Sequence, residues 1–138
     1  MLRKLFFILI LGLCFAEVAQ AISKPVTLWI DAEANYPRLS TRDEITAMLD
    51  KAKSNGFNAI VLDVRPVKGE ALYDSAFMPK CMTLGNKPFV QDWDYVRFFC
   101  DQAKERGMKV SLSATVFTMG LPEWRVGPAY DDPQWNDK

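Results

Sequence analysis

The chain has 138 residues, of which 17 are basic and 17 acidic, and it contains three cysteines and no histidine. With 49% hydrophobic and 25% charged residues, the composition is that of a globular protein, and the length suits a single domain. The net charge of zero gives no electrostatic basis for binding nucleic acid, and the lack of histidine excludes Ser-His-Asp, Cys-His and histidine-bearing zinc sites.

The first 21 residues have the three parts of a secretory signal peptide. Residues 3–4 are basic, residues 5–15 are apolar, and residues 19–21 have the small-x-small pattern of a cleavage site. Because the apolar run is shorter than the ~20 residues of a spanning helix, we expect no permanent membrane span. Cleavage after Ala21 predicts an exported protein, periplasmic or extracellular. An uncleaved anchor and a lipid-modified Cys14 are the alternatives.

A strand and a helix are predicted first in the mature chain. Residues 26–30 are a short apolar run that predicts a strand, and residues 31–39 are too polar and irregular to continue it. Residues 41–44, Thr-Arg-Asp-Glu, have the form of a capping box, which predicts the start of a helix. Apolar side chains then recur at helical spacing up to a glycine suited to a left-handed cap: Ile45, Met48, Leu49, Ala52 and Gly56.

A second strand, a helix and a third strand follow. Residues 58–64 are nearly continuously apolar, which is typical of a parallel strand buried on both faces. After a long loop over residues 67–91, Asp92 is expected to cap a helix that ends at Gly107. The buried face of this helix is expected to carry Val96, Phe99, Cys100 and Ala103. Residues 108–117 alternate apolar and polar and predict the third strand, and the remainder has the composition of a loop.

This order of elements predicts an α/β fold with parallel strands joined by right-handed helical crossovers. Open doubly wound sheets and (β/α)8 barrels both begin in this way. Residues 31–35 lack the glycine-rich turn of nucleotide-binding open sheets, which favours the barrel. Because a barrel needs ~200 residues or more, residues 22–138 are expected to be the first three βα-type units of an incomplete TIM barrel.

Polar side chains at the predicted strand ends are the candidates for chemistry, because function gathers where parallel strands end. Asp31 and Glu33 follow the first strand, and Asp63 and Arg65 end the second. Neighbouring strands lie ~4.8 Å apart, so these side chains are expected to converge, with Tyr73 nearby. Unequal surroundings would raise the pKa of one carboxyl group and keep another ionised, as glycosidic cleavage requires. An acid–arginine ladder that only fixes the strands is the alternative.

Other chemistries have no motif to support them. The sequence has no CxxC pair, no metal-ligand spacing and no phosphate-binding glycine loop, so we expect neither a metal nor a cofactor. Trp29 lies within the first strand and is expected in the core. Export would permit a disulfide between Cys81 and Cys100, but two small buried apolar side chains are the preferred interpretation.

Four segments, in order, resemble the bacterial glycosyl-hydrolase-like family ten proteins. They are Leu28-Trp-Ile30, then Thr41-Arg-Asp-Glu-Ile45 with residues 52–60, then Val64-Arg-Pro66 with residues 69–75, and finally residues 103–110. The resemblance spans residues 26–117. It implies an exported TIM-barrel protein that hydrolyses glycosidic bonds in a polysaccharide or a cell-wall glycan.

The chain also departs from that family's pattern. Ser111-Leu-Ser113 stands where the family has a histidine, Asp63 stands where glutamine is common, and the acidic segment of a later strand is absent. The resemblance therefore implies an N-terminal fragment that is inactive alone, with its catalytic residues unassigned. Its glycan contacts would come from Asp31, Glu33, Asp63, Arg65 and Tyr73. Two alternatives stay open: a small exported carbohydrate- or partner-binding module, and a self-contained hydrolase that uses Asp31 and Asp63.

Overall fold

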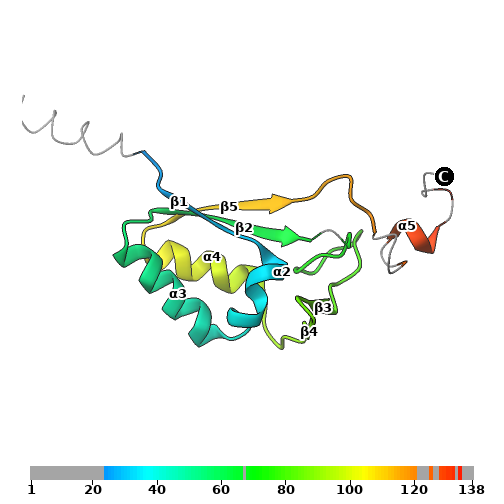
Figure 1. Ribbon diagram of the computed structural model, residues 1–138, viewed down its shortest axis with the longest axis horizontal. Coiled ribbons are helices and arrows are strands. Elements are labelled where there is room, and N and C mark those ends of the chain that lie inside the picture. The colour runs from blue at the N-terminus through cyan, green and yellow to red at the C-terminus, as the bar shows by residue number, and fades with distance from the viewer. Residues whose placement is uncertain (1–23, 67, 121–124, 126–127, 133, 135–138) are drawn as a thin grey trace, which may run out of the picture.

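The computed structural model describes residues 24–66, 68–120, 125, 128–132 and 134. The predicted signal peptide, residues 1–21, lies outside the described residues. Three parallel strands form the main sheet in the order β1-β2-β5: β1 (Thr27–Ile30), β2 (Ala59–Arg65) and β5 (Lys109–Ala114). Helices α3 (Arg42–Ser54) and α4 (Tyr95–Glu105) both lie against the same face of this sheet, as Figure 1 shows.

Shorter elements occupy the connections. The turn after β1 contains the short helix α2 (Ala32–Asn35) and the 3-10 helix η1 (Tyr36–Arg38), where an irregular turn was expected. A two-stranded antiparallel ribbon, β3 (Thr83–Leu84) and β4 (Lys87–Pro88), interrupts the predicted loop over residues 67–91. The helix α5 (Pro128–Asp131) follows β5. These elements are too short for hydrophobic periodicity to reveal them.

The prediction of TIM-barrel units is wrong. The described residues form a small α/β fold in which a three-stranded parallel sheet stands beside a separate antiparallel ribbon. A sheet closes on itself only with many more strands, about eight in small barrels, and these three leave it open. The βαβ order of the sequence is common to open sheets and barrels, so it supports the α/β class and no more.

The first predicted helix is confirmed as α3. Its capping box is complete, because Glu44 N–H donates to Thr41 Oγ1 over 3.2 Å and Thr41 N–H donates to Glu44 Oε2 over 3.0 Å. Ile45 and Leu49 of its predicted apolar stripe are fully buried. Gly56 has a φ of +87° just beyond the helix end, the left-handed conformation that glycine adopts at such caps.

The second predicted helix is present as α4, but its predicted cap is wrong. Asp94, and not Asp92, caps the helix by accepting a hydrogen bond of 2.8 Å from Arg97 N–H. The Trp93 ring packs against Tyr95, with centroids 5.7 Å apart, and the Arg42 guanidinium lies 5.1 Å from the Trp93 ring centroid. These contacts hold Trp93 outside the helix, so the helix begins two residues later than Asp92 would place it.

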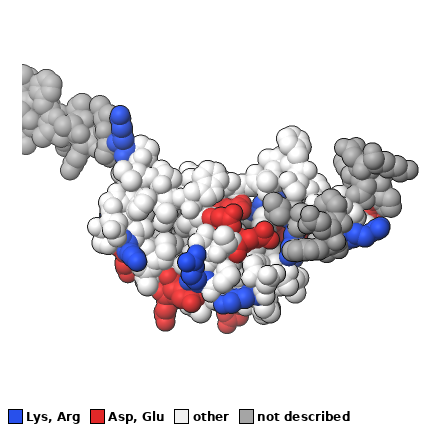
Figure 2. Space-filling view, viewed as in Figure 1, with Lys and Arg blue, Asp and Glu red and all other residues white. Residues whose placement is uncertain are grey.

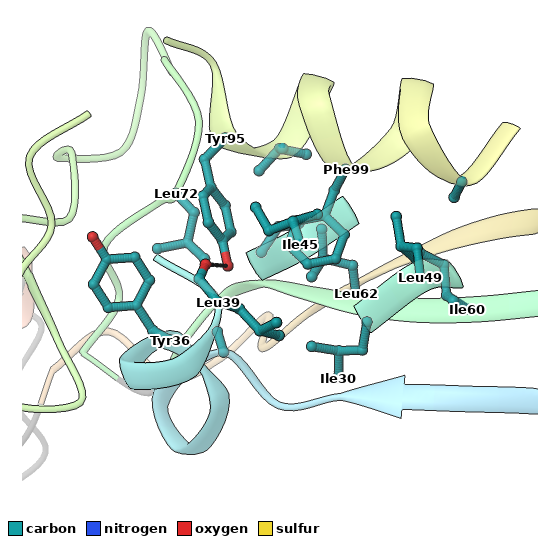
Figure 3. Close-up of a cluster of buried hydrophobic side chains, with 14 of the residues drawn as sticks. Ile30, Tyr36, Leu39, Ile45, Leu49, Ile60, Leu62, Leu72, Tyr95 and Phe99 are labelled. Atoms are coloured by element: carbon teal, nitrogen blue, oxygen red, sulfur yellow. Dashed lines mark hydrogen bonds between the residues drawn. The ribbon is translucent and has the colours of Figure 1, made fainter. Parts of the chain in front are cut away.

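The core lies between the sheet and the two long helices (Figure 3). Ile30, Ile60 and Leu62 project from the sheet toward the helical residues Ile45, Leu49 and Phe99. At one end of this core, the Tyr95 hydroxyl donates to the Leu39 carbonyl oxygen over 3.0 Å, which satisfies a buried polar group.

The opposite face of the sheet is open among the described residues, and this corrects the placement of Trp29. Its side chain is 63% exposed, so the expectation of a core position is wrong. Trp29 pairs in register with Val61 of β2, which pairs with Ser111 of β5, so these three residues form one row across the sheet. The helices cover the alternate residues of β1 and β2, among them Ile30 and Leu62, since successive side chains of a strand point to opposite faces.

Cys81 and Cys100 are both free, so the structure has no disulfide between them, and the prediction of a buried apolar side chain is confirmed for Cys81. Cys81 is completely buried, and Cys100 is half-buried on α4. Burial is the main cause that raises the pKa of the Cys81 thiol, to about 12, and the carboxyl group of Glu70 adds to it. Cys81 therefore behaves as a small apolar side chain.

Candidate functional site

Asp31 and Asp63 lie side by side where β1 and β2 end. Ile30 pairs with Leu62 in parallel register, so the next residue of each strand falls at the same level and on the open face. Figure 2 shows acidic atoms gathered above α2 and the ends of these strands, with basic atoms beside them. The sequence prediction that these two carboxylates meet at one edge of the sheet agrees with this arrangement.

Asp31 has a local structural role at this edge. It is the N-cap of α2, and its Oδ1 accepts a hydrogen bond of 2.8 Å from Ala34 N–H. The Asn35 side-chain amide donates to the Asp31 carbonyl oxygen over 2.8 Å and closes the same turn. Asp31 is nevertheless exposed to solvent.

Asp63 is half-buried and is the electrostatically unusual group of the site. Its pKa is raised above the ordinary aspartate value, chiefly by burial, and the neighbouring charge of Asp31 adds to this. Backbone N–H groups of Arg65, at 3.4 Å, and of Ala32 donate to the carboxylate and lower the pKa in part. Burial prevails over these hydrogen bonds, so the net shift of the Asp63 pKa is upward.

Arg65 turns to a different set of partners. A register shift between Asp63 and Arg65 marks an irregularity at the end of β2, and the Arg65 side chain is only 5% exposed. Its guanidinium donates to the carbonyl oxygens of Thr115, Val116 and Thr118, which follow β5. Among the described residues it forms no ion pair, so it ties the chain after β5 to the end of β2.

The remaining two predicted residues lie apart from this pair. Glu33 is half-buried on α2, and its backbone carbonyl faces the turn between β3 and β4. Tyr73 is half-buried in the loop after β2, where it lines a cavity of about 260 Å³ together with Trp93. The structure therefore brings Asp31 and Asp63 together, while the side chains of Arg65 and Tyr73 have other surroundings.

Trp29 is the neighbour that sequence reasoning missed. It precedes Asp31 by two residues, and Val61 precedes Asp63 by two, so the indole and the carboxylates share the open face. The alternation of side chains along β1 could have revealed its exposure, because Leu28 and Ile30 face the core and Trp29, between them, must face the other way. On β5, Ser111 pairs with Val61 and Ser113 pairs with Asp63, so hydroxyl groups extend the rows of Trp29 and of the carboxylates across the sheet.

The arrangement can bind neutral polar ligands. Carboxylates accept hydrogen bonds from hydroxyl groups, and a flat exposed indole offers an apolar surface to C–H groups. Two adjacent carboxylates disfavour an anionic ligand. Within the described residues, no three His, Cys, Asp or Glu side chains are grouped in a way that would hold a metal ion.

Comparison with known proteins finds a relative that is named for the bacterial cell surface. An S-layer-related protein of Niallia circulans is 30% identical over 109 residues, which covers 70% of this chain. The chain spans only 6% of the length of that protein. No protein-family model matches the chain. In the part of the chain that the structure describes, no helix has the length and apolar character needed to cross a membrane.

Proposed function

We propose that this chain belongs to an exported protein of the cell surface that binds a neutral glycan on the open face of its sheet. The observation that carries the proposal is the row of Asp31 and Asp63 beside the exposed indole of Trp29. An aromatic face for the pyranose ring and carboxylates for its hydroxyl groups are the two contacts that a sugar requires.

The surface location rests on two independent supports. The N-terminal sequence has the pattern of a secretory signal, and the relative found in Niallia circulans is named an S-layer-related protein. An exported protein at a bacterial surface meets polysaccharides and cell-wall glycans. These are also the substrate class that the resemblance to the glycosyl-hydrolase-like proteins implies.

Glycan hydrolysis is proposed for a longer protein that includes this region, and binding for the region itself. Of the two carboxyl groups, Asp63 is the better candidate for the general acid, because its surroundings raise its pKa above the ordinary aspartate value. The second carboxylate that hydrolysis needs has a weaker candidate, since Asp31 is committed to capping α2. Binding requires neither carboxylate to react.

The test measures sedimentation of the full chain with insoluble cell-wall glycan and with cellulose. Trp29→Ala and Asp63→Asn are each expected to weaken binding by about tenfold, the effect of losing one good aromatic or hydrogen-bond contact. Asp31→Asn is expected to do the same without loss of the helix cap, because asparagine caps helices as well as aspartate does.

Phe77→Ala is the matched control for Trp29→Ala. Phe77 is also an aromatic side chain with high exposure, 90%, but it lies in the loop after β2. Its removal is expected to leave glycan binding unchanged. Binding that survives both Trp29→Ala and Asp63→Asn would overturn the proposal, and so would an equal loss in Phe77→Ala.

A further inference from the structure

A cavity of about 260 Å³ lies where the loop after β2 meets the start of α4. Its aromatic floor is formed by the buried side chains of Phe89 and Tyr95, and the half-buried side chains of Trp93 and Tyr73 also line it. The volume lies just below the range of about 300–1,000 Å³ for drug-sized ligands, so it matches one small ring. The Asp31–Asp63 pair does not line this cavity.

The wall of the cavity is held in place before any ligand arrives. Ala71 N–H donates to the Pro79 carbonyl over 2.9 Å, and Cys81 N–H donates to the Ala71 carbonyl over 2.8 Å. Lys80 forms an ion pair of 2.9 Å with Asp74 across the same loop. On the other side, the Gln91 amide donates to the Tyr36 hydroxyl and the Ser40 carbonyl.

The charged side chains that line the cavity indicate which class of ligand it can bind. Among the described residues that line the cavity, three are acidic, Asp74, Asp92 and Asp94, and one is basic, Lys80. Lys80 is already paired with Asp74. Asp94 also caps α4, where it accepts a hydrogen bond from Arg97 N–H, so Asp92 contributes most of the negative charge at the rim. This charge disfavours carboxylates and phosphates and attracts a cation. Just outside the cavity, the Arg42 guanidinium lies 5.1 Å from the Trp93 ring centroid, so the cation–π contact of this ring is already made and a cationic ligand depends on the rim carboxylates.

We infer that this cavity binds an amino sugar, a single pyranose ring with a protonated amino group. The aromatic floor takes the C–H face of the ring, and the carboxylates of Asp92 and Asp94 at the rim take the ammonium group. A zwitterionic amino acid is a poorer ligand, because the negative rim repels its carboxylate. A neutral hexose is also poorer, because it has no positive charge to pair with the rim carboxylates. The site is separate from the glycan surface proposed above and does not rest on it.

The test titrates the full chain with glucosamine, with N-acetylglucosamine and with glucose at mildly acidic pH, followed by amide chemical shifts and by calorimetry. Glucosamine is expected to bind tightest, with shifts at residues 71–74 and 91–95. Asp92→Asn and Asp94→Asn are each expected to weaken it by about fivefold, the scale of one carboxylate lost near a rim charge. The Asp94→Asn variant keeps α4 capped, since asparagine is an equally good N-cap.

Glu105→Gln is the matched control, because it removes one negative charge from the far end of the same helix α4. It is expected to leave glucosamine binding unchanged. Equal affinity for glucosamine and N-acetylglucosamine, no binding of glucosamine, or an equal loss in Glu105→Gln would each overturn the inference. Thermal unfolding of every variant confirms that the compared proteins are folded.

Discussion

Replacing Gly85 by alanine tests how the ribbon β3–β4 supports the candidate site. Gly85 lies in the ribbon turn with a φ of +54°, a conformation that side chains rarely adopt. A Cβ there would overlap the Glu33 carbonyl oxygen and would stand 3.1 Å from the Pro37 ring. Both neighbours belong to the short helices α2 and η1, which follow Asp31 directly.

The expected decrease in the free energy of unfolding of Gly85→Ala has two parts, a conformational cost and a steric cost. A left-handed residue with a Cβ is less stable than glycine by about 1–2 kcal/mol. The contact with Glu33 is backbone, so relief requires the ribbon to move away from α2 and η1. That movement strains the hydrogen bonds from Lys87 Nζ to the Pro37 carbonyl and from the Tyr36 hydroxyl to the Pro88 carbonyl, at about 1 kcal/mol each. We expect Gly85→Ala to lower the free energy of unfolding by about 3 kcal/mol.

Urea denaturation of Gly85→Ala beside Gly56→Ala separates the two parts. Gly56 has a φ of +87°, but a Cβ on it would meet nothing within 4 Å. Gly56→Ala is therefore expected to lower the free energy of unfolding only by the conformational cost of a left-handed residue, about 1 kcal/mol. Equal destabilisation of the two variants would refute the reasoning, because it would show that the close approach of the ribbon to Glu33 contributes nothing.

Three further predictions concern groups in or near the site. The pKa of Asp63 is higher in the folded state than in the unfolded state, so the ionised carboxylate destabilises the fold at neutral pH. Asp63→Asn should therefore raise the free energy of unfolding at neutral pH, and denaturation curves below about pH 4, where the carboxyl group is protonated in both states, should show no gain. Arg65→Met should lower the free energy of unfolding by about 3 kcal/mol in urea, because three carbonyl groups lose a charged donor; weaker glycan binding at unchanged stability would instead make Arg65 a ligand contact. Cys81 should resist a thiol reagent in the native protein and react after denaturation, since burial raises the pKa of its thiol to about 12; rapid native reaction would contradict its burial.

The parts of the fold that local sequence determines were predictable. The capping box of Thr41 and Glu44 and the apolar spacing of Ile45 and Leu49 specify α3 without reference to anything distant. The cap of α4 was not predictable in the same way, because Asp92 and Asp94 are equally good caps. The Arg42 guanidinium of α3 lies over the Trp93 ring, outside α4, and this contact is tertiary, so the sequence near the cap does not reveal it.

The proximity of the two carboxylates was predictable from the sequence, but the orientations of the neighbouring side chains were not. Parallel register alone brings Asp31 beside Asp63 once both strands are placed. The orientation of Arg65 depends on the irregularity at the end of β2 and on carbonyl groups some 50 residues away, which no local pattern reveals. The exposure of Trp29 depends on which face the helices cover, and that is decided by packing of the whole sheet.

The open face of the sheet carries two features that do not stabilise the free protein. Asp63 is half-buried with a raised pKa, and the cation nearest in sequence, Arg65, donates to carbonyl groups beyond β5. Trp29 leaves 63% of a large apolar side chain in water on the same face. Such groups arise where a site is arranged for a ligand at some expense to stability. A glycan that stacks on the indole and donates hydroxyl hydrogen bonds to Asp63 would satisfy both, and for this reason the double variant Trp29→Ala/Asp63→Asn should bind less tightly while unfolding no more readily than the natural chain.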